Sequence, residues 1–469
     1  MQFDSFTFLV FFAAVLAAYN ALGAWPARKW LLLGASYVFY AAWNPPFLLL
    51  LLGSTTLDWW IARRIDAAQE PSARKRWVML TLLVNLGVLA FFKYNRFLLD
   101  NFAALPALIG VKYVPAQLDI VLPIGISFYT FHSLSYCLDI YRRKFAPTPS
   151  WRDYALYVAF FPQLVAGPIT RFPQMRPQIE APRRTTRAGL GLGLSLLVLG
   201  LFEKSVLADS IFAPVADAFF NASANAGTAV AWSGVLAFSG QIFCDFAGYS
   251  TCAIGAALAL GFELPTNFRF PYAAVGFSDF WRRWHISLSS WLRDYLYISF
   301  GGNRRGEART YVNLLLTMLI GGLWHGAAWT FVIWGGLHGL YLSVERLLRE
   351  HVWPARWNSA ALRFVYGLIT LFFVVLAWVW FRATDFAAGC DIFHKLFFAQ
   401  GGYVLGAAQQ LALAAFAATV VTHWLLRERD LKSLIARTPA PLLGLVLGLL
   451  LAAIVLSPGD NHAFIYFQF

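Results

Sequence analysis

The stretch GGLWHGAAWTFVIWGGLHG, residues Gly321–Gly339, places His325 in a segment apolar enough to enter a membrane. A titratable side chain is costly to keep in hydrocarbon, so this histidine is a candidate functional residue. Gly321, Gly322 and Gly326 surround it and thin the helix, which would let another backbone or a ligand approach closely. The alternative is a core histidine bonded to a carbonyl, with the glycines serving helix packing alone. On the residues alone the two interpretations are equally supported.

The composition of the 469-residue chain is that of a multi-pass membrane protein. Hydrophobic residues make up 59% of it and charged residues only 13%, which is outside the usual range of soluble domains. Apolar runs of about 18 or more residues, each long enough to cross roughly 30 Å of hydrocarbon as a helix, recur along the chain. They are residues 5–22, 30–52, 77–93, 119–139, 188–207, 229–260 (expected as two pieces), 310–344 (broken near His325), 360–381, 403–426 and 440–457. The sequence therefore predicts an all-α polytopic membrane protein, with residues 1–469 as one domain.

The net charge of +13 follows the expected topology, which argues against nucleic acid as a partner. Most of the 37 lysines and arginines gather in alternate connections, namely residues 58–77, 141–152, 171–187, 262–310, 345–363 and 427–437. By the positive-inside rule these segments lie in the cytoplasm and the carboxyl terminus lies outside. Arg28 and Lys29 fit this arrangement less well.

Motifs for several kinds of catalytic and metal site are missing from the sequence. The four cysteines form no CxxC pair and no Cys/His cluster at ligand spacing, so we expect neither a disulfide scaffold nor a metal site. There is also no P-loop and no GxSxG nucleophile elbow. The sequence thus speaks against ATP hydrolysis and against a serine triad.

Two stretches depart from a simple spanning pattern. Residues 159–179 are apolar but carry four prolines, which cannot sit in one continuous helix. Such backbone is tolerated at membrane depth only inside protein or beside a water-filled cavity, so we expect a re-entrant element. Residues 262–310 are dense in aromatic residues and arginines, and we expect an amphipathic helix at the inner interface. At about 100° per residue its apolar face, with His285 at the edge, would collect Trp281, Trp284, Leu288, Trp291, Leu292 and Tyr295.

The other histidines receive structural interpretations. His132 is expected to be buried and hydrogen-bonded. In one straight helix His338 would lie about 20 Å from His325 on a nearly opposite face, so those two are not expected to form a dyad. The rest lie in connections, at helix ends or in the tail: His351, His394, His423 and His462.

Charged side chains offer further candidates. Four acids could orient a histidine or carry protons, although capping or a pairing arginine is the favoured interpretation: Asp58, Asp139, Glu203 and Asp245. The arginines of residues 282–309 could hold the phosphates of a nucleotide-bearing ligand. They serve equally well as topology determinants.

The chemistry that suits His325 is proton transfer. A neutral imidazole with a pKa near 6.5 can take a proton from a hydroxyl at physiological pH. An alcohol could then attack a thioester directly, without a covalent enzyme intermediate. Trp324 and Trp329 would supply rigid walls around the ring.

A series of motifs runs in order over nearly the whole chain. They are VLPIGISFYTFHSLSYCLDIYRR (121–143), FFPQLVAGPITR (160–171), QIFCDFAGYS (241–250), NFRFPY (267–272), FWRRWHISLSSWLRDYLYISFGGNR (280–304), the stretch of Gly321–Gly339 and FIYFQF (464–469). Together they resemble the membrane-bound O-acyltransferase (MBOAT) family, in its bacterial alginate O-acetyltransferase branch. One departure is Thr251, where that branch often has an acidic residue after GYS, so no role is assigned there.

The resemblance implies an integral enzyme of the bacterial inner membrane. Such an O-acyltransferase takes an acetyl group from cytoplasmic acetyl-CoA and passes it across the membrane to an extracytoplasmic polysaccharide such as alginate. A periplasmic or surface partner acyltransferase of the SGNH, esterase-like type generally assists. In family terms His325 matches the principal catalytic histidine and His285 a second functional one, with no metal and no cofactor beyond acetyl-CoA as donor substrate. The family fold wraps about eleven helices, with re-entrant and interfacial elements, around a funnel or tunnel.

Other functions stay open at this point. The same chemistry could act on peptidoglycan or cellulose, or transfer D-alanine to teichoic acid. A proton-coupled transporter or channel would also place histidines and acids in the membrane, although the chain shows no related halves of the kind seen in many transporters. A membrane scaffold for a polysaccharide synthase is a third class.

Overall fold

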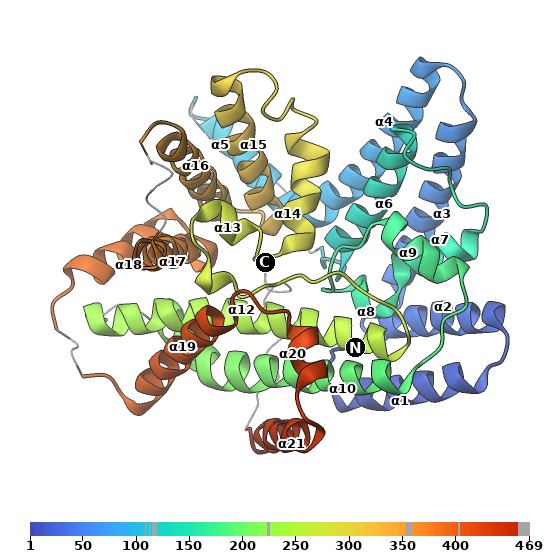
Figure 1. Ribbon diagram of the computed structural model, residues 1–469. Coiled ribbons are helices and arrows are strands. Elements are labelled where there is room, and N and C mark those ends of the chain that lie inside the picture. The colour runs from blue at the N-terminus through green and yellow to red at the C-terminus, as the bar shows by residue number, and fades with distance from the viewer. Residues whose placement is uncertain are drawn as a thin grey trace. The chain divides into compact units, whose positions relative to one another are not determined.

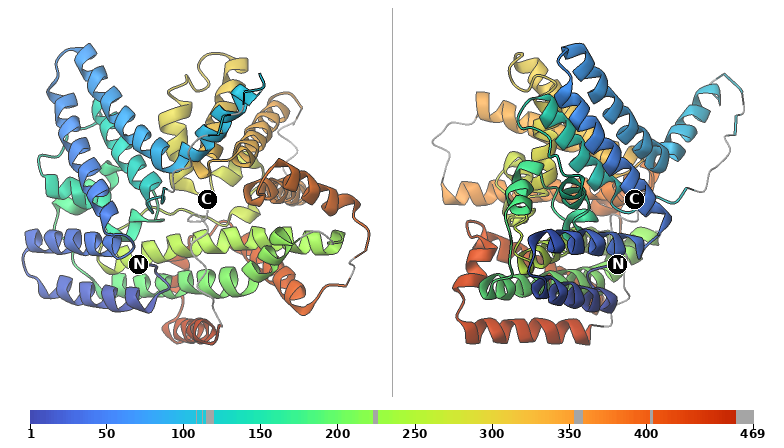
Figure 2. Two further views of the ribbon diagram at one scale, coloured as in Figure 1. Left: turned by 180° about the vertical axis from the view of Figure 1, so that it is seen from behind. Right: turned by 90° about the vertical axis from the view of Figure 1, so that its right-hand side faces the viewer.

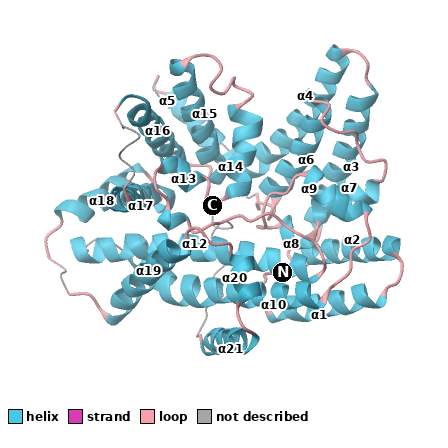
Figure 3. Cartoon of the chain, viewed as in Figure 1, coloured by secondary structure: helices cyan, strands magenta, loops and turns pink. Residues whose placement is uncertain are grey.

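Every regular element of the described chain is a helix (Figure 3). The computed structural model describes residues 1–107, 109–111, 113–114, 120–222, 226–352, 359–401 and 404–457. The prediction of an all-α protein is therefore confirmed. The contacts divide the chain into two compact units, one of Met1–Leu194 with Ala253–Pro265, the other of Ser195–Cys252 with Thr266–Phe469. The FIYFQF motif, His462 and the predicted external terminus lie outside the described residues.

The first unit is built mainly from α1 to α9. Their bounds are α1 Phe6–Ala21, α2 Trp25–Ala41, α3 Pro46–Ala67, α4 Pro71–Leu89, η1 Ala90–Tyr94, α5 Asn95–Ala107, α6 Ile126–Tyr141, α7 Trp151–Ala159, α8 Phe161–Leu164 and α9 Phe172–Glu180. Helices α3, α4 and α6 pack side by side, as Figures 1 and 2 show in blue to teal. Asp58 of α3 is buried in this packing and accepts hydrogen bonds from Thr81 and Asn85 of α4, at 2.6 and 2.9 Å.

Two prolines interrupt the apolar run of residues 30–52. Helix α2 ends at Ala41, and α3 begins at Pro46 and continues to Ala67. Proline has no N–H and clashes with the preceding turn, so Pro45 and Pro46 start a helix rather than continue one. The prediction of a single helix over residues 30–52 is therefore wrong.

The proline-rich stretch of residues 159–179 forms two short helices, α8 and α9, and not one long helix. This agrees with the proline pattern, while passage of this stretch into a membrane stays a prediction. The connection between the two helices is buried. In it, the backbone N–H of Thr170 donates to Nε2 of His132 at 3.2 Å. His132 is fully buried, so the predicted burial and hydrogen bonding of this histidine are confirmed.

The second unit contains the remaining helices. Two helices, α10 (Arg187–Leu201) and α12 (Thr228–Ala259), have residues in both units. Helix α12 is continuous over 32 residues, so the expectation of two pieces in residues 229–260 is wrong. It contains no proline, and its glycines serve packing instead of breaking it. A Cβ added at Gly248, for example, would lie 2.7 Å from the carbonyl oxygen of Gly200. The other bounds are η2 Phe202–Phe212, α11 Ala213–Asn221, η3 Pro271–Ala273, α13 Phe277–Trp281, α14 Ile286–Leu292, η4 Arg293–Tyr297, α15 Glu307–His325, α16 Trp329–His351, α17 Ala360–Arg382, α18 Phe386–Phe398, α19 Ala407–Leu426, α20 Leu431–Arg437 and α21 Ala440–Leu456.

Several helices of the described chain are long and apolar enough to cross a membrane. By length and composition there are 5, or up to 6 if the bent pair α20 and α21 forms one span. The five are Pro71–Pro106, Arg187–Asn221, Thr228–Ala259, Ala360–Arg382 and Ala407–Leu426. This number supports a multi-pass membrane protein, and the count of about eleven spans stays a prediction.

Candidate functional site

His325 is the last residue of α15, where the chain breaks before α16. Gly326 is extended, at φ −156° and ψ 148°. A Cβ added to it would lie 2.0 Å from the ring of Phe331, so only glycine fits this turn. The chain enters α16 at Trp329, three residues further on. The predicted break near His325 is therefore confirmed.

The ring of His325 lies among aromatic side chains. Its exposed fraction is 3%, and ring centroids of Trp324, Trp334 and Phe381 lie 4.9, 5.0 and 5.4 Å away. The predicted wall at Trp324 is thus present. The other predicted wall is wrong, because Trp329 is 59% exposed. Trp334, one and a half turns along α16, faces His325 instead.

Glycines bring the backbones of α15 and α16 together. The two helices pack along each other (Figure 1). A Cβ on Gly322 would lie 2.2 Å from the carbonyl oxygen of Phe331 and 3.0 Å from Cα of Gly335. The close approach predicted from the glycines is therefore an approach of one helix to another.

His285 lies in the turn between α13 and α14, with a left-handed backbone at φ 42° and ψ 53°. The single amphipathic helix predicted here is wrong. The backbone of the turn bonds to a neighbouring segment instead: the N–H of Arg269 donates to the carbonyl of Arg283, and the N–H of Ile286 to that of Asn267, both at 2.9 Å. The helical pattern did identify buried side chains, since all but Trp281 of the predicted apolar face are buried: Trp284, Leu288, Trp291, Leu292 and Tyr295.

The structure brings His285 and His325 side by side. Their ring centroids are 6.4 Å apart, and His285 is fully buried against the edge of Phe246, with centroids 4.6 Å apart. Burial lowers the pKa of His285 to about 3, so its ring is neutral at physiological pH. A ring nitrogen lies about 1.2 Å from its centroid, so nitrogens of the two rings stay about 4 Å or more apart, too far for a direct hydrogen bond.

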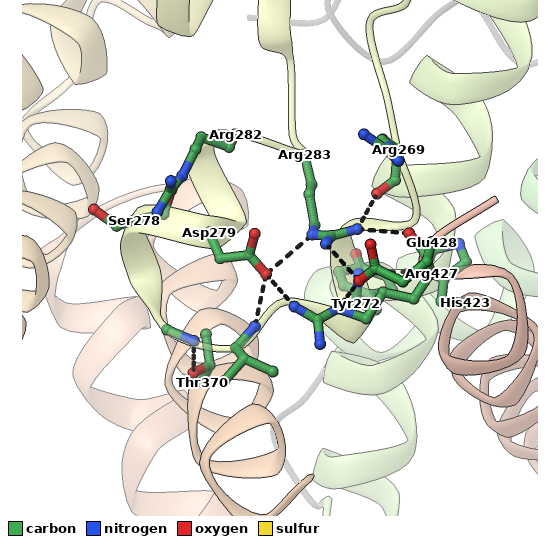
Figure 4. Close-up of polar contacts among 12 residues, drawn as sticks. Arg269, Tyr272, Ser278, Asp279, Arg282, Arg283, Thr370, His423, Arg427 and Glu428 are labelled. Carbon is green, nitrogen blue, oxygen red and sulfur yellow. Dashed lines mark hydrogen bonds and ion pairs between the residues drawn. The ribbon is translucent and has the colours of Figure 1, made fainter. Parts of the chain in front are cut away.

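Arg283 is an anchor of the His285 turn and not a free cation. Its guanidinium is nearly buried and contacts Asp279 at 3.0 Å, and Arg427 contacts the same carboxylate oxygen at 2.8 Å (Figure 4). Nη1 of Arg283 also donates to the carbonyl oxygen of Arg427 at 3.0 Å. Of the arginines that could hold phosphates or determine topology, Arg283 is thus engaged in ion pairs within the protein. Other arginines of this segment are exposed: Arg282, Arg293, Arg304, Arg305 and Arg309.

A hollow of about 270 Å³ opens beside this ion-pair cluster. Its lining residues are Ala360, Arg363, Trp424, Leu425, Arg427, Glu428 and Arg429. Sequence reasoning missed it because the arginines come from two connections that are far apart in the chain. Taken separately, each connection indicates only topology.

A buried ion-pair cluster lies in the second unit, between η2 and α12. Nζ of Lys204 contacts Asp209 at 2.8 Å and Asp245 at 2.6 Å, and all three side chains are at most 5% exposed. A structural role for Asp245 is thus supported, with a lysine as its partner. In the first unit the half-exposed Lys144 pairs with the buried Asp139 at 2.8 Å. Oε2 of Glu203 is buried and has no hydrogen-bond partner among the described residues.

The remaining histidines lie apart from this pair of rings. His338 is fully buried, and Trp334 packs against both its ring and that of His325, at 4.9 and 5.0 Å. His423 is buried and accepts a hydrogen bond from the backbone N–H of Tyr272 at 3.2 Å. His351 and His394 are exposed. These placements agree with the structural interpretations.

The two histidines and their aromatic surroundings fall within a recognised domain. Residues 141–386 match the family model described as MBOAT, membrane-bound O-acyltransferase family. The chain belongs to the membrane-bound O-acyltransferase family. One relative is a probable alginate O-acetylase of Pseudomonas aeruginosa, which is 44% identical over 85% of this chain and 75% of the relative. A peptidoglycan O-acetyltransferase of Helicobacter pylori is 39% identical over 81% of this chain and 75% of the relative.

A more distant relative is the teichoic acid D-alanyltransferase of Lacticaseibacillus rhamnosus, 28% identical over 60% of this chain and 75% of the relative. As an MBOAT protein, the chain is a multi-pass membrane enzyme that transfers acyl groups to oxygen. The matched region 141–386 contains both His285 and His325.

Proposed function

We propose that this protein is an inner-membrane O-acetyltransferase. It takes acetyl groups from cytoplasmic acetyl-CoA and passes them across the membrane for O-acetylation of alginate or a similar exopolysaccharide. The observation that carries this proposal is the buried pair of His285 and His325, 6.4 Å apart within the family domain. The names of relatives with 41–44% identity, probable alginate O-acetylases, support the acceptor. A periplasmic or surface acyltransferase of the SGNH type completes delivery to the polysaccharide.

In the proposed reaction His325 acts as general base. The acceptor hydroxyl gives its proton to the imidazole, and its oxygen forms a bond to the carbonyl carbon of the thioester. The carbon–sulfur bond then breaks, and the leaving thiolate takes the proton back from His325. The aromatic walls exclude water, which strengthens these interactions and protects the thioester from hydrolysis. The alternative form is an acyl relay, in which His325 carries the acetyl group.

The test is transfer of label from radiolabelled acetyl-CoA by purified protein with its partner and glycan. His325→Ala should abolish transfer with unchanged membrane abundance, while the exposed control His351→Ala should transfer normally. Near-normal transfer by His325→Ala would overturn the proposal. Label trapped on the wild-type protein but not on His325→Ala would identify the acyl relay. Solute flux independent of any thioester would instead identify a transporter.

Peptidoglycan is the second candidate acceptor. It is favoured by the 39% identity to the peptidoglycan enzyme. Supplying the protein with alginate and with peptidoglycan fragments in parallel distinguishes the two. If only the peptidoglycan fragments were acetylated, peptidoglycan and not alginate would be the acceptor, and the proposed O-acetyl transfer would still hold.

A further inference from the structure

The side chain of Asn267 is the hydrogen-bonding centre beside His285. It is fully buried. Its Oδ1 lies 3.1 Å from Nδ1 of His285 and accepts from both Oγ and the backbone N–H of Ser287, at 2.8 and 3.3 Å. Its Nδ2 donates to Oγ of Ser250 on α12 at 3.0 Å. The amide is thus held from several sides.

These contacts fix the proton on the ring of His285. A backbone N–H can only donate, so the Asn267 atom that faces Ser287 is the amide oxygen. An amide oxygen can only accept, so Nδ1 of His285 must carry a hydrogen. A neutral imidazole has only one such hydrogen, which leaves Nε2 with a lone pair. Nε2 is buried and has no hydrogen-bond partner among the described residues.

The chemistry of the reactants narrows what this nitrogen can bind. In the reaction proposed above, the single hydrogen of the acceptor hydroxyl goes to His325, and the thioester group itself has none. In acetyl-CoA the hydrogen-bond donor nearest to the thioester is the amide N–H of the pantetheine arm, two carbon atoms from the sulfur. From ordinary bond lengths, that amide nitrogen lies roughly 4 to 5 Å from the thioester carbonyl carbon. With a hydrogen bond of about 3 Å at each end, a bent arm of this span can reach both rings, whose centroids are 6.4 Å apart.

We propose that Asn267 is a positioning residue that locks His285 in the Nδ1–H tautomer, so that Nε2 accepts a hydrogen bond from the amide N–H of the donor's thioester arm. The inference rests on the function proposed above and states which group of the acetyl donor is recognised. Recognition of this kind is selective, because a donor without the amide leaves Nε2 buried and unpaired.

The test compares two short acetyl donors, S-acetyl-N-acetylcysteamine, which has the amide, and S-ethyl thioacetate, which lacks it. The wild-type protein should prefer the first by about tenfold or more in kcat/KM. Asn267→Leu removes the acceptor that fixes the tautomer and should bring the ratio close to one. Ser287→Ala removes only another donor to Oδ1 and should keep the preference.

A second variant guards against misfolding of Asn267→Leu. In His285→Asn the new amide nitrogen takes the place of Nδ1 and keeps the bond to Asn267, while Nε2 is lost. It should fold normally and lose the preference. A wild-type ratio near one, or an unchanged ratio in folded Asn267→Leu or His285→Asn, would overturn the inference. Failure of the wild type to use acetyl-CoA or either short thioester would instead refute the proposed function.

Discussion

Replacing Gly322 with alanine should displace His325 by pushing helices α15 and α16 apart. The added methyl carbon would lie 2.2 Å from the carbonyl oxygen of Phe331, whereas ordinary contacts of this kind need about 3.2 Å or more. Helices α15 and α16 must therefore separate by about 1 Å. Overpacking of this kind costs about 1 to 3 kcal/mol. His325 ends the same helix three residues later, and a displacement of about 1 Å at a reacting group lowers activity about 100-fold.

The matched control is Gly336→Ala on α16, whose added carbon meets Cδ2 of Leu319 at an ordinary 3.4 Å. Thermal unfolding in detergent measures the stability of both variants, and acetyl transfer measures their activity. Gly322→Ala should lose both stability and activity, and Gly336→Ala should stay close to wild type. Equal behaviour of the two variants in both assays would refute the idea that close helix approach positions His325.

Three further predictions follow from buried polar groups. Lys204→Met leaves two buried aspartates without their common partner and should lower the free energy of unfolding by about 3 to 5 kcal/mol, measured by denaturant titration. His338→Met should keep acetyl transfer within about twofold, since its ring nitrogens have no hydrogen-bond partners among the described residues and an apolar replacement is nearly neutral. Asn267→Asp puts a carboxylate against His285 and raises its pKa from about 3. Protonation then removes the Nε2 lone pair at higher pH, so the preference for the amide-bearing donor should be lost at a pH about 1 to 3 units higher than in the wild type. Protonation of the general base His325 affects both donors alike and cancels in this ratio.

The sequence predicted the helical class, the break near His325 and the absence of one continuous helix in the proline-rich stretch, because each depends on local chemistry. Glycine and proline act on the backbone within a few residues. The continuity of α12 was not predicted. Its glycines serve contact with helices that are distant in the sequence, which the residues of α12 alone do not reveal.

The turn at His285 shows the limit of pattern reasoning. A helical period of 3.6 residues identified Trp284 and Leu288 as buried, but it carries no information on whether the backbone between them and α13 is continuous. Backbone hydrogen bonds with Asn267 and Arg269 set the conformation of this turn. These two residues lie in an upstream segment without a helical pattern. Lys204 gave a signal that could have been used, since a lysine within an apolar run needs a buried partner.

The ion pairs of Arg283 have a consequence for the order in which the site can be completed during synthesis. The turn that holds His285 is anchored to the carbonyl and guanidinium of Arg427, 144 residues further along the chain. A nascent chain that has reached the end of the family domain therefore contains both histidines but lacks this anchor. This contact can form only after α19 and Arg427 have emerged from the ribosome and packed. A chain cut short before Arg427 would therefore carry every recognisable motif of the matched region but would lack this anchor.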